Sequence, residues 1–185
     1  MSQFLSDTAV LPQGESRWRA EGHRGWRIGS AANGGYVLAL VGRALSEALK
    51  QPDPLSINAF YLAPVVLGEV EVAAESLSET RSTHFASAAL RQEGQLKLRA
   101  TAAYTDLDQL KGPDWTNVTP PEVPAFDEAA SLTMSHLEIH QRIDLRMVQG
   151  AEVFTEGKTN GSGEFVAWLA HKDGAAPGPI DLLMF

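Results

Sequence analysis

The residues best suited to chemistry in this sequence are Asn33-Gly34-Gly35, which stand directly before an apolar run at residues 36–45. This run predicts a helix over residues 36–50, with Asn33 or Ser30 as its N-cap. Backbone N–H groups at a helix N-terminus carry partial positive charge, and glycines let a ligand approach closely. These amides are therefore candidates for stabilising the oxyanion that forms when a carbonyl group is attacked. The competing interpretation is that the two glycines only allow tight packing of the helix against a sheet.

His136 and His140 have the spacing of two metal ligands on one helix. The surrounding residues 137–147 alternate between apolar and polar side chains, which predicts a strand instead. On a strand, four residues would separate the two imidazoles by about 13 Å, too far for one ion. We therefore expect no metal site at this pair.

Several catalytic signatures are missing from the sequence. It contains no Cys, which excludes a thiolate nucleophile, a disulfide and a cysteine metal site. It contains no G-x-S-x-G serine motif, no G-x-G-x-x-G and no P-loop. We expect neither a serine acyl-enzyme nor a cofactor.

Charge and hydropathy narrow the expected partners and location. The net charge of -8 and the pI near 5.1 disfavour binding to a phosphate backbone, so we do not expect nucleic acid as a partner. The longest strongly apolar run, residues 34–45, is shorter than the ~20 residues that span a bilayer, so we expect no membrane span. The first residues show no secretory signal, and together with the lack of Cys this favours a cytoplasmic location.

The elements that must position the glycines are a helix and four strands. The helix run is apolar on all sides over three turns, which predicts burial. Strand composition follows at residues 55–62, 65–77, 83–92 and 95–105, with turns between them. Val70 and Val72 alternate with Glu69 and Glu71, which is typical of a strand with one buried face. This order predicts an α+β fold in which an antiparallel sheet wraps around a central helix.

The chain divides into two units. Residues 1–110 form the first unit, residues 111–125 are a Pro-rich linker, and residues 126–185 form the second. In the second unit we predict strands over 137–147 and 161–169 and the first turn of a helix at 179–185. Because the sequence ends inside an apolar run, we expect this second unit to be incomplete.

Three segments carry a family pattern. Asn33-Gly34-Gly35-Tyr36 opens the central helix, and residues 55–64 resemble S-x-x-x-x-F-L-x-P with Tyr61 in place of Phe. Residues 80–85 resemble a G-R-S turn with Thr80 in place of glycine. These segments, which span roughly residues 26–107, resemble the double hot-dog acyl-CoA thioesterases, the thioesterase II-like family. Residues 143–146 and 168–171 resemble more weakly the first strands of that family's second hot dog.

The resemblance implies a hot-dog domain in residues 1–110 and the start of a second, incomplete hot dog in residues 126–185. It implies hydrolysis of acyl-CoA thioesters by water attack. The catalytic residues expected on this basis are Asn33, Gly34 and Gly35. The substrate-binding residues expected are Tyr36, Arg81, Ser82 and His84. For His84 a structural role competes with this, since a lone His on a strand is more often structural.

In complete family members, an Asp on the second central helix and Thr or Ser and Gln on later strands position the attacking water. None of these can be assigned in this sequence, and we expect Asp181 to lie at the start of a helix instead. We therefore expect a homo-oligomer, or pairing with a C-terminal segment that carries the remaining groups.

Two other functions stay open. The first is a non-catalytic module that binds an acyl group, acyl-CoA or another protein without hydrolysis. The second is a hydratase or dehydratase acting on acyl thioesters, which needs an Asp and a His in the loop near the helix. The sequence does not clearly supply that pair.

Overall fold

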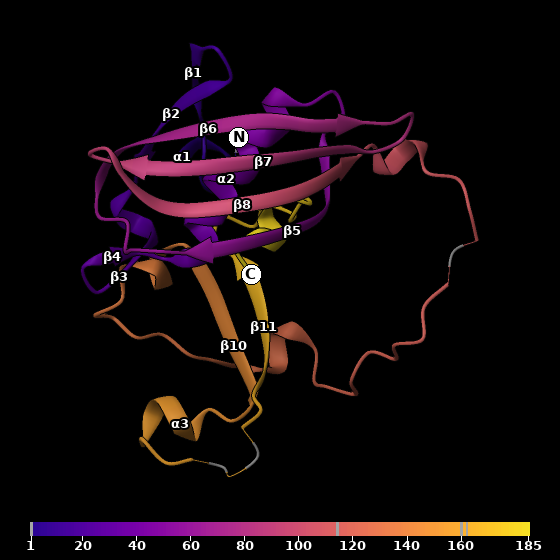
Figure 1. The fold of residues 1–185 in the computed structure, drawn as a ribbon. Helices are drawn as coiled ribbons and strands as arrows, with labels where there is room; N and C mark the ends of the chain where they lie inside the picture. Colours follow the sequence, from indigo (N-terminus) through magenta and orange to yellow (C-terminus); the bar gives the residue numbers. More distant parts are fainter. Residues whose placement is uncertain (1, 114, 160, 162) are drawn as a thin grey trace.

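A computed structural model describes residues 2–113, 115–159, 161 and 163–185 of the chain. Its main element is a six-stranded antiparallel sheet in the order β1-β2-β6-β7-β8-β5, which curls over one long helix, α2 (Figure 1). The strands are β1 (Leu11–Gly14), β2 (Arg17–Gly22), β5 (Asp53–Tyr61), β6 (Gly68–Glu79), β7 (His84–Gln92) and β8 (Gln95–Thr105). The predicted α+β arrangement of a sheet around a central helix is confirmed.

The central helix α2 (Gly34–Ala48) begins after Asn33, which is one of the two predicted N-caps. It ends two residues earlier than predicted, ahead of Pro52, a residue that cannot continue a helix. The side chains of Leu40 and Leu45 are completely buried, as the all-apolar run predicted. Burying one such leucine contributes about 1.5–3 kcal/mol. The helix is therefore the centre of the hydrophobic core.

The inner face of the sheet follows the predicted alternation. On β6, Val70 and Val72 are buried while Glu69 and Glu71 are not. The neighbouring strands contribute small side chains to the same face, which lets the sheet approach the helix; these are Ala86, Ala88, Ala100 and Ala102. In the described chain, each of the two edge strands of this sheet, β1 and β5, has a neighbouring strand on one side only.

A second, smaller sheet lies below the first in the view of Figure 1. It contains β9 (Ala130–Ser131), β10 (Ile143–Gln149) and β11 (Val166–His171) in the order β11-β10-β9. The connection from the large sheet contains short 3-10 turns η2 (Leu107–Gln109) and η3 (Phe126–Glu128), and the described residues between these turns loop away from the body (Figure 1). A short helix, α3 (Glu152–Thr155), joins β10 to β11.

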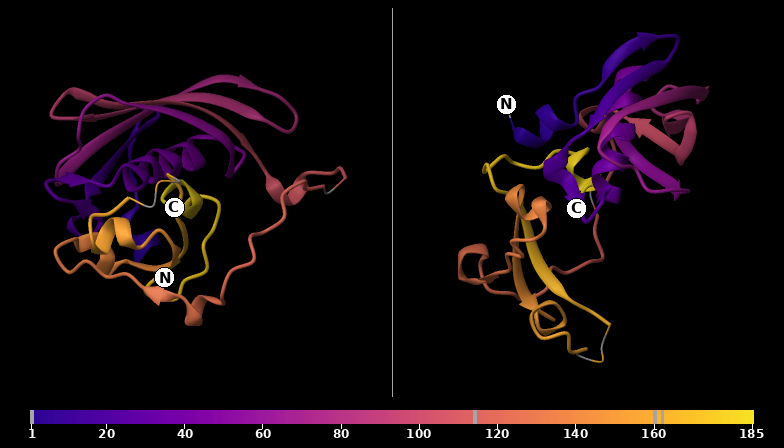
Figure 2. Two further views of the ribbon diagram at one scale, coloured as in Figure 1. Left: turned by 90° about the horizontal axis from the view of Figure 1, so that it is seen from below. Right: turned by 90° about the vertical axis from the view of Figure 1, so that its left-hand side faces the viewer.

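The chain then returns to the large unit. The last 3-10 turn, η5 (Asp181–Leu183), packs against α2, and Figure 2 shows this segment beneath the helix. Glycines on α2 permit this contact, because a Cβ atom at Gly42 would lie 2.7 Å from Leu183 Cδ1. Within the described residues, no helix is long and apolar enough to cross a membrane.

The first thirty residues hold more structure than the expected entry strand and loops. They contain α1 (Gln3–Asp7), a 3-10 turn η1 (Arg24–Trp26) and a small hairpin of β3 (Arg27–Ile28) with β4 (Ala31–Ala32). Helix α1 has only five residues, too short to show a hydrophobic period. It is held by its contacts: Ser2 caps it, and Phe4 is buried against Trp26.

The predicted strand over residues 137–147 is wrong in its first half. Residues Glu138–Gln141 form a 3-10 turn, η4, and the strand begins only at Ile143. The Glu138 carboxylate accepts hydrogen bonds from Arg24 and Arg27 of the large unit. These bonds lower the pKa of Glu138, with the Arg27 contribution largest. A partner far away in sequence therefore overrides the local alternation.

The remaining boundaries in the second unit also differ. The strand predicted over 161–169 is β11 at Val166–His171, and its predicted position 162 lies outside the described residues. The predicted helix turn at 179–185 is shorter, because η5 covers only Asp181–Leu183. The strand predicted over 65–77 begins later, at Gly68, since Val65 instead accepts a hydrogen bond from Ala32.

Candidate functional site at the N-terminus of the central helix

The first turn of α2 presents free backbone donors. The Asn33 side chain accepts the Tyr36 N–H at 3.0 Å, and the Asn33 carbonyl accepts the Val37 N–H at 3.0 Å. Gly34 and Gly35 lie between Asn33 and Tyr36. Their backbone N–H groups have no hydrogen-bond partner within the described part of the chain. A helix of 15 residues directs its dipole to this point. The predicted oxyanion donors are therefore available.

One cavity opens at Gly34 and has a volume of about 360 Å³. The Tyr61 hydroxyl donates a hydrogen bond of 2.9 Å to the Gly34 carbonyl, which holds the phenol ring across this glycine. Lys97, from β8, is the only charged residue that lines this cavity among the described residues. The remaining lining is apolar and consists of Ala32, Val37, Leu62, Ala63, Pro64 and Val65.

A second cavity is lined by Asn33, the residue before the helix, and has a volume of about 190 Å³. Its wall comes mainly from the second unit. Apolar residues form most of it: Ile139, Ile143, Leu145, Leu169, Met184 and Phe185. The polar residues of this wall, within the described chain, are Asn33 and His140. The helix end therefore lies between an apolar hollow and a hollow with a cationic residue.

The two glycines have different surroundings. A Cβ atom at Gly35 would lie 2.5 Å from the carbonyl oxygen of Met184 and 2.8 Å from its Cα atom. A Cβ atom at Gly34 would instead lie 3.3 Å from the edge of the Tyr61 ring. Tight packing therefore explains why residue 35 is a glycine. The helix packs here against the backbone at Met184, which follows η5, and not against the sheet. At Gly34 the atoms nearest to an added Cβ belong to a side chain, that of Tyr61, and not to the backbone.

Tyr36 is fully buried and lines none of the described cavities. Its ring stacks on Trp26 with 5.5 Å between centroids. Its hydroxyl lies 2.7 Å from the Asp7 carbonyl oxygen and 2.8 Å from the Glu21 carbonyl oxygen, and it accepts the His23 N–H. Burial raises the pKa of Tyr36 well above its usual value. This placement favours anchoring of the helix end over the predicted contact with substrate.

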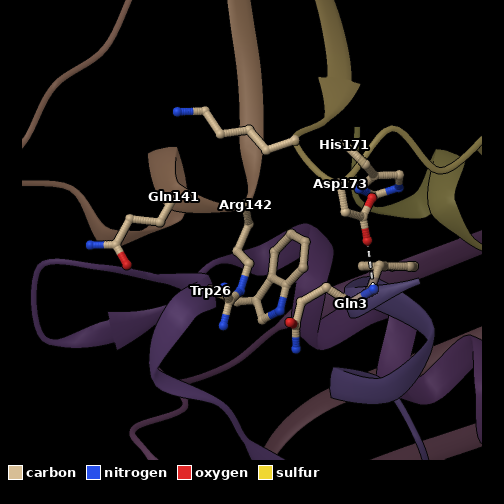
Figure 3. Close-up of a pocket in the computed structure, with 8 residues that line it drawn as sticks. Gln3, Trp26, Gln141, Arg142, His171 and Asp173 are labelled. Atoms are coloured by element: carbon tan, nitrogen blue, oxygen red, sulfur yellow. Dashed lines mark hydrogen bonds between the residues drawn. The ribbon is translucent and has the colours of Figure 1, made fainter. Parts of the chain in front are cut away.

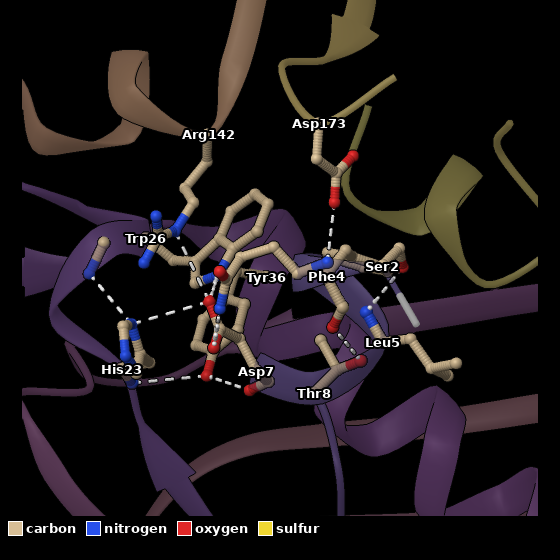
Figure 4. Close-up of polar contacts among 12 residues, drawn as sticks. Ser2, Phe4, Leu5, Asp7, Thr8, His23, Trp26, Tyr36, Arg142 and Asp173 are labelled. Atoms are coloured by element: carbon tan, nitrogen blue, oxygen red, sulfur yellow. Dashed lines mark hydrogen bonds and ion pairs between the residues drawn. The ribbon is translucent and has the colours of Figure 1, made fainter. Parts of the chain in front are cut away.

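Asp7 holds the same region together from α1 (Figure 4). Its buried carboxylate accepts the Trp26 Nε1–H at 2.9 Å and lies 3.6 Å from His23 Nδ1 and 3.4 Å from Arg142 Nε. Trp26 in turn accepts the Asn33 N–H through its carbonyl group. Sequence reasoning missed Asp7, because a single acidic residue near the start of a chain gives no signal of its own.

Arg81 and Ser82 lie far from the glycines. They line a cavity of about 500 Å³ together with Lys50 and Gln51, which follow the C-terminal end of α2. The 15 residues of the helix separate this cavity from Gly34 by roughly 22 Å at 1.5 Å per residue. The structure therefore places the predicted substrate-binding turn and the predicted catalytic glycines at opposite ends of one helix.

His84 lies on the inner side of β7 and is buried. Its Nε2 atom is 2.7 Å from Ser76 Oγ, and its Nδ1 atom has no partner in the described structure. It lines none of the described cavities. This position agrees better with the structural interpretation of His84 than with direct contact to a substrate.

A further hollow of about 230 Å³ lies where α1 meets the second unit (Figure 3). His171, Arg142 and Asp173 line it together with Gln3 and Trp26. The buried His171 Nε2 lies 2.7 Å from Asp181 Oδ1, and Asp181 Oδ2 accepts the Gly178 N–H at 3.0 Å. Asp181 thus binds the backbone at the start of η5, which agrees with the expected helix-start position.

Metal binding by His136 and His140 was excluded on the assumption of a strand, and that assumption is wrong, since His140 lies in η4. The described residues nevertheless contain no cluster of three or more His, Cys, Asp or Glu that could hold an ion. The chemistry available at the helix end is therefore that of amides, a phenol, an ammonium and an imidazole.

Known proteins share this architecture. Residues 23–105 match the family model of the acyl-CoA thioesterase N-terminal domain. A protein assigned as a thioesterase II from Thermobifida fusca YX covers 100% of this chain at 24% identity, with a TM-score of 0.88. A protein with a hot dog fold from Alicyclobacillus acidocaldarius covers 94% at 18% identity and a TM-score of 0.79. An acyl-CoA thioesterase II from Mycobacterium marinum covers 98% at 13% identity and a TM-score of 0.71. No curated protein matches the chain.

The sheet around a helix and these structural neighbours define a hot-dog protein of the α+β class. The match over residues 23–105 shows that this part of the chain is similar to the acyl-CoA thioesterase N-terminal domain. The chain spans 72%, 64% and 66% of the three neighbouring structures, in the order given.

Proposed function

We propose that this protein hydrolyses acyl-CoA thioesters to a free acid and CoA by direct attack of water. The observation that carries this proposal is the pair of unpartnered amides at Gly34 and Gly35, at the end of a buried helix and between two cavities. Donors held in place before the reaction stabilise a developing oxyanion without reorganisation. The family match supplies the substrate class.

The two cavities fit the two halves of such a substrate. The apolar hollow beside Asn33 accommodates the acyl chain, and the hollow at Gly34 accommodates the start of the CoA arm, with Lys97 as the cation on the side from which the phosphates follow. The carbonyl oxygen then lies at the helix end. Water adds to the carbonyl carbon, the C–S bond breaks, and the thiolate leaves with a proton. Neither cavity is lined by a Ser, Thr or Cys among the described residues, which supports water as the nucleophile.

We also propose that residues 1–110 are one hot-dog domain, residues 111–125 a linker and residues 126–185 the start of a second, incomplete hot dog. The small sheet of β9, β10 and β11, followed by η5 beside α2, supports this division. The edge strand β5 exposes Leu55, Phe60 and Tyr61, which supports the expected association with a second copy or a further segment. A monomeric mass in sedimentation equilibrium at micromolar concentration would contradict association between copies.

The alternative is a module that binds acyl-CoA without hydrolysing it. Incubation with acyl-CoAs of several chain lengths, followed by thiol detection, separates the two functions. Release of CoA supports hydrolysis, whereas binding without release supports the module.

Gly34→Pro tests the oxyanion role directly. Gly34 is the first residue of the helix, where proline is well tolerated, and the Asn33 backbone (φ -59°, ψ 139°) suits a residue before proline. The change removes the Gly34 N–H and keeps the helix. We expect kcat to fall about 10²- to 10³-fold. Gly34→Ala keeps the N–H and is the matched control. Equal activity of the two variants would exclude Gly34 as a donor.

A further inference from the structure

Two tyrosine side chains make the same kind of contact with the central helix. The Tyr61 hydroxyl, from β5, donates a hydrogen bond of 2.9 Å to the Gly34 carbonyl. The Tyr104 hydroxyl, from β8, donates a hydrogen bond of 2.9 Å to the Gly42 carbonyl, which lies about two turns further along α2. Tyr61 lines the cavity at Gly34, whereas Tyr104 does not. The two contacts therefore share their chemistry and differ in their distance from the helix end.

The Gly34 carbonyl belongs to the same peptide group as the Gly35 N–H. This group is trans, so its C=O and N–H bonds point in opposite directions within one plane. Glycine backbone is less restricted than that of other residues, which leaves a peptide group between two glycines more freedom to tilt. The Gly35 N–H has no hydrogen-bond partner within the described part of the chain. A bond to the Gly34 oxygen therefore fixes the direction of one proposed oxyanion donor.

The same bond makes the Gly35 N–H a stronger donor. A hydrogen bond to a carbonyl oxygen polarises its peptide group, and connected hydrogen bonds strengthen one another by about 10–30%. The Gly34 oxygen has two lone pairs, so it can accept the phenol and still take part in the helix. The partial burial of Tyr61 raises the pKa of its hydroxyl, so the phenol keeps its proton near neutral pH. Tyr61 is therefore a donor under these conditions.

The strand holds the phenol of Tyr61 in place over the helix end. Tyr61 is the last residue of β5 and pairs with Leu98 of β8. The next residue, Leu62, donates its N–H to the Lys97 carbonyl at 2.8 Å. The ring edge of Tyr61 lies 3.3 Å from the position that a Cβ atom would take at Gly34. The position of the hydroxyl thus follows from strand pairing and not from a free loop.

We propose that Tyr61 is a positioning residue for the oxyanion donor at Gly35, an inference that rests on the proposed hydrolase function. The Gly35 N–H is the group that binds the oxygen of the attacked carbonyl. Tyr61 acts on it through the shared peptide group, by orienting and polarising that group. Tyr61 exchanges no proton, and the inference assigns no residue to the activation of water.

The test compares Tyr61→Phe with Tyr104→Phe in the full chain, each shown to be folded by circular dichroism. Both changes keep the ring and remove a hydroxyl that binds a glycine carbonyl of α2. One oxyanion donor is worth about 10²- to 10³-fold in kcat, and a 10–30% weaker donor loses about 2- to 8-fold of it. We expect this fall in kcat for Tyr61→Phe, with KM unchanged. We expect Tyr104→Phe to keep the wild-type kcat.

The Gly35 amide reports on the contact without any substrate. In NMR spectra of isotope-labelled protein, Tyr61→Phe should move the amide nitrogen resonance of Gly35 upfield, because its peptide group loses polarisation. Tyr104→Phe should leave the Gly35 resonance in place. It should instead move that of Arg43, whose N–H shares a peptide group with the Gly42 carbonyl.

The outcomes separate the two proposals. If the wild type releases no thiol from any acyl-CoA, the hydrolase function fails, and the role of Tyr61 fails with it. If the wild type is active but Tyr61→Phe keeps its kcat, or the Gly35 resonance does not move, only the role of Tyr61 is refuted. An equal fall in kcat for Tyr104→Phe also refutes it, because a general loosening of α2 would explain both variants. A change in KM alone would indicate direct contact with substrate and would overturn the inference.

Discussion

Replacement of Gly35 by alanine should destabilise the protein, whereas the same change at Gly34 should not. The added Cβ atom at position 35 would lie 2.5 Å from the Met184 carbonyl oxygen and 2.9 Å from that of Leu183. These are backbone atoms, so they cannot rotate away as the end of a side chain can. At position 34 the nearest atom is 3.3 Å away, on the Tyr61 ring, and a small tilt of the ring relieves the contact.

The magnitude follows from two opposed terms. A Gly→Ala change inside a helix gains up to about 1 kcal/mol of unfolding free energy through propensity. An added carbon in a filled space costs about 1–3 kcal/mol when backbone must shift. At Gly35 the second term is near its upper range, so we expect a net loss of about 1–2 kcal/mol. At Gly34 the gain dominates, and we expect a change between zero and about 1 kcal/mol of stabilisation.

Urea unfolding monitored by tryptophan fluorescence measures both changes. Gly42→Ala serves as an intermediate case, because its nearest neighbour at 2.7 Å is the movable Cδ1 atom of Leu183. The expected order of stability is Gly34→Ala, then Gly42→Ala, then Gly35→Ala. If Gly35→Ala is as stable as Gly34→Ala within about 0.5 kcal/mol, η5 does not pack on α2 as described.

Three further predictions concern other parts of the molecule. Asp7→Ala should lower the unfolding free energy by about 2–4 kcal/mol in urea titration, because it removes the acceptor of Trp26 Nε1–H and leaves Arg142 without its carboxylate; an unchanged midpoint would contradict this. Burial raises the pKa values of Tyr36 and Tyr104, so the folded state binds these protons more tightly than the unfolded state. Their contribution is present below about pH 10, the unfolded value, and is lost above it, so phenolate absorbance from these two should appear only with unfolding. Lys97→Ala should raise KM for acyl-CoA about 3- to 10-fold at low salt, with a smaller effect at high salt, since the screened charge contributes less.

Local patterns were sufficient for the central helix and for the buried face of β6. The all-apolar run and Asn33 predicted the buried helix and its cap, because an N-cap and a 3.6-residue period act over a few residues. The alternation of apolar and polar residues on β6 predicted which face of the strand is buried, because successive side chains of a strand point to opposite faces. The family resemblance of these segments agrees with the match over residues 23–105.

The tertiary structure decided where the candidate groups lie. Arg81 and Gly34 occupy opposite ends of α2, a separation that depends on how the sheet folds over the helix. His140 reaches the apolar cavity because Glu138 pairs with Arg24 and Arg27, more than a hundred residues away in sequence. Sequence periodicity reports which face of an element is apolar, whereas ion pairs between distant segments and the walls of a cavity exist only once the chain has folded.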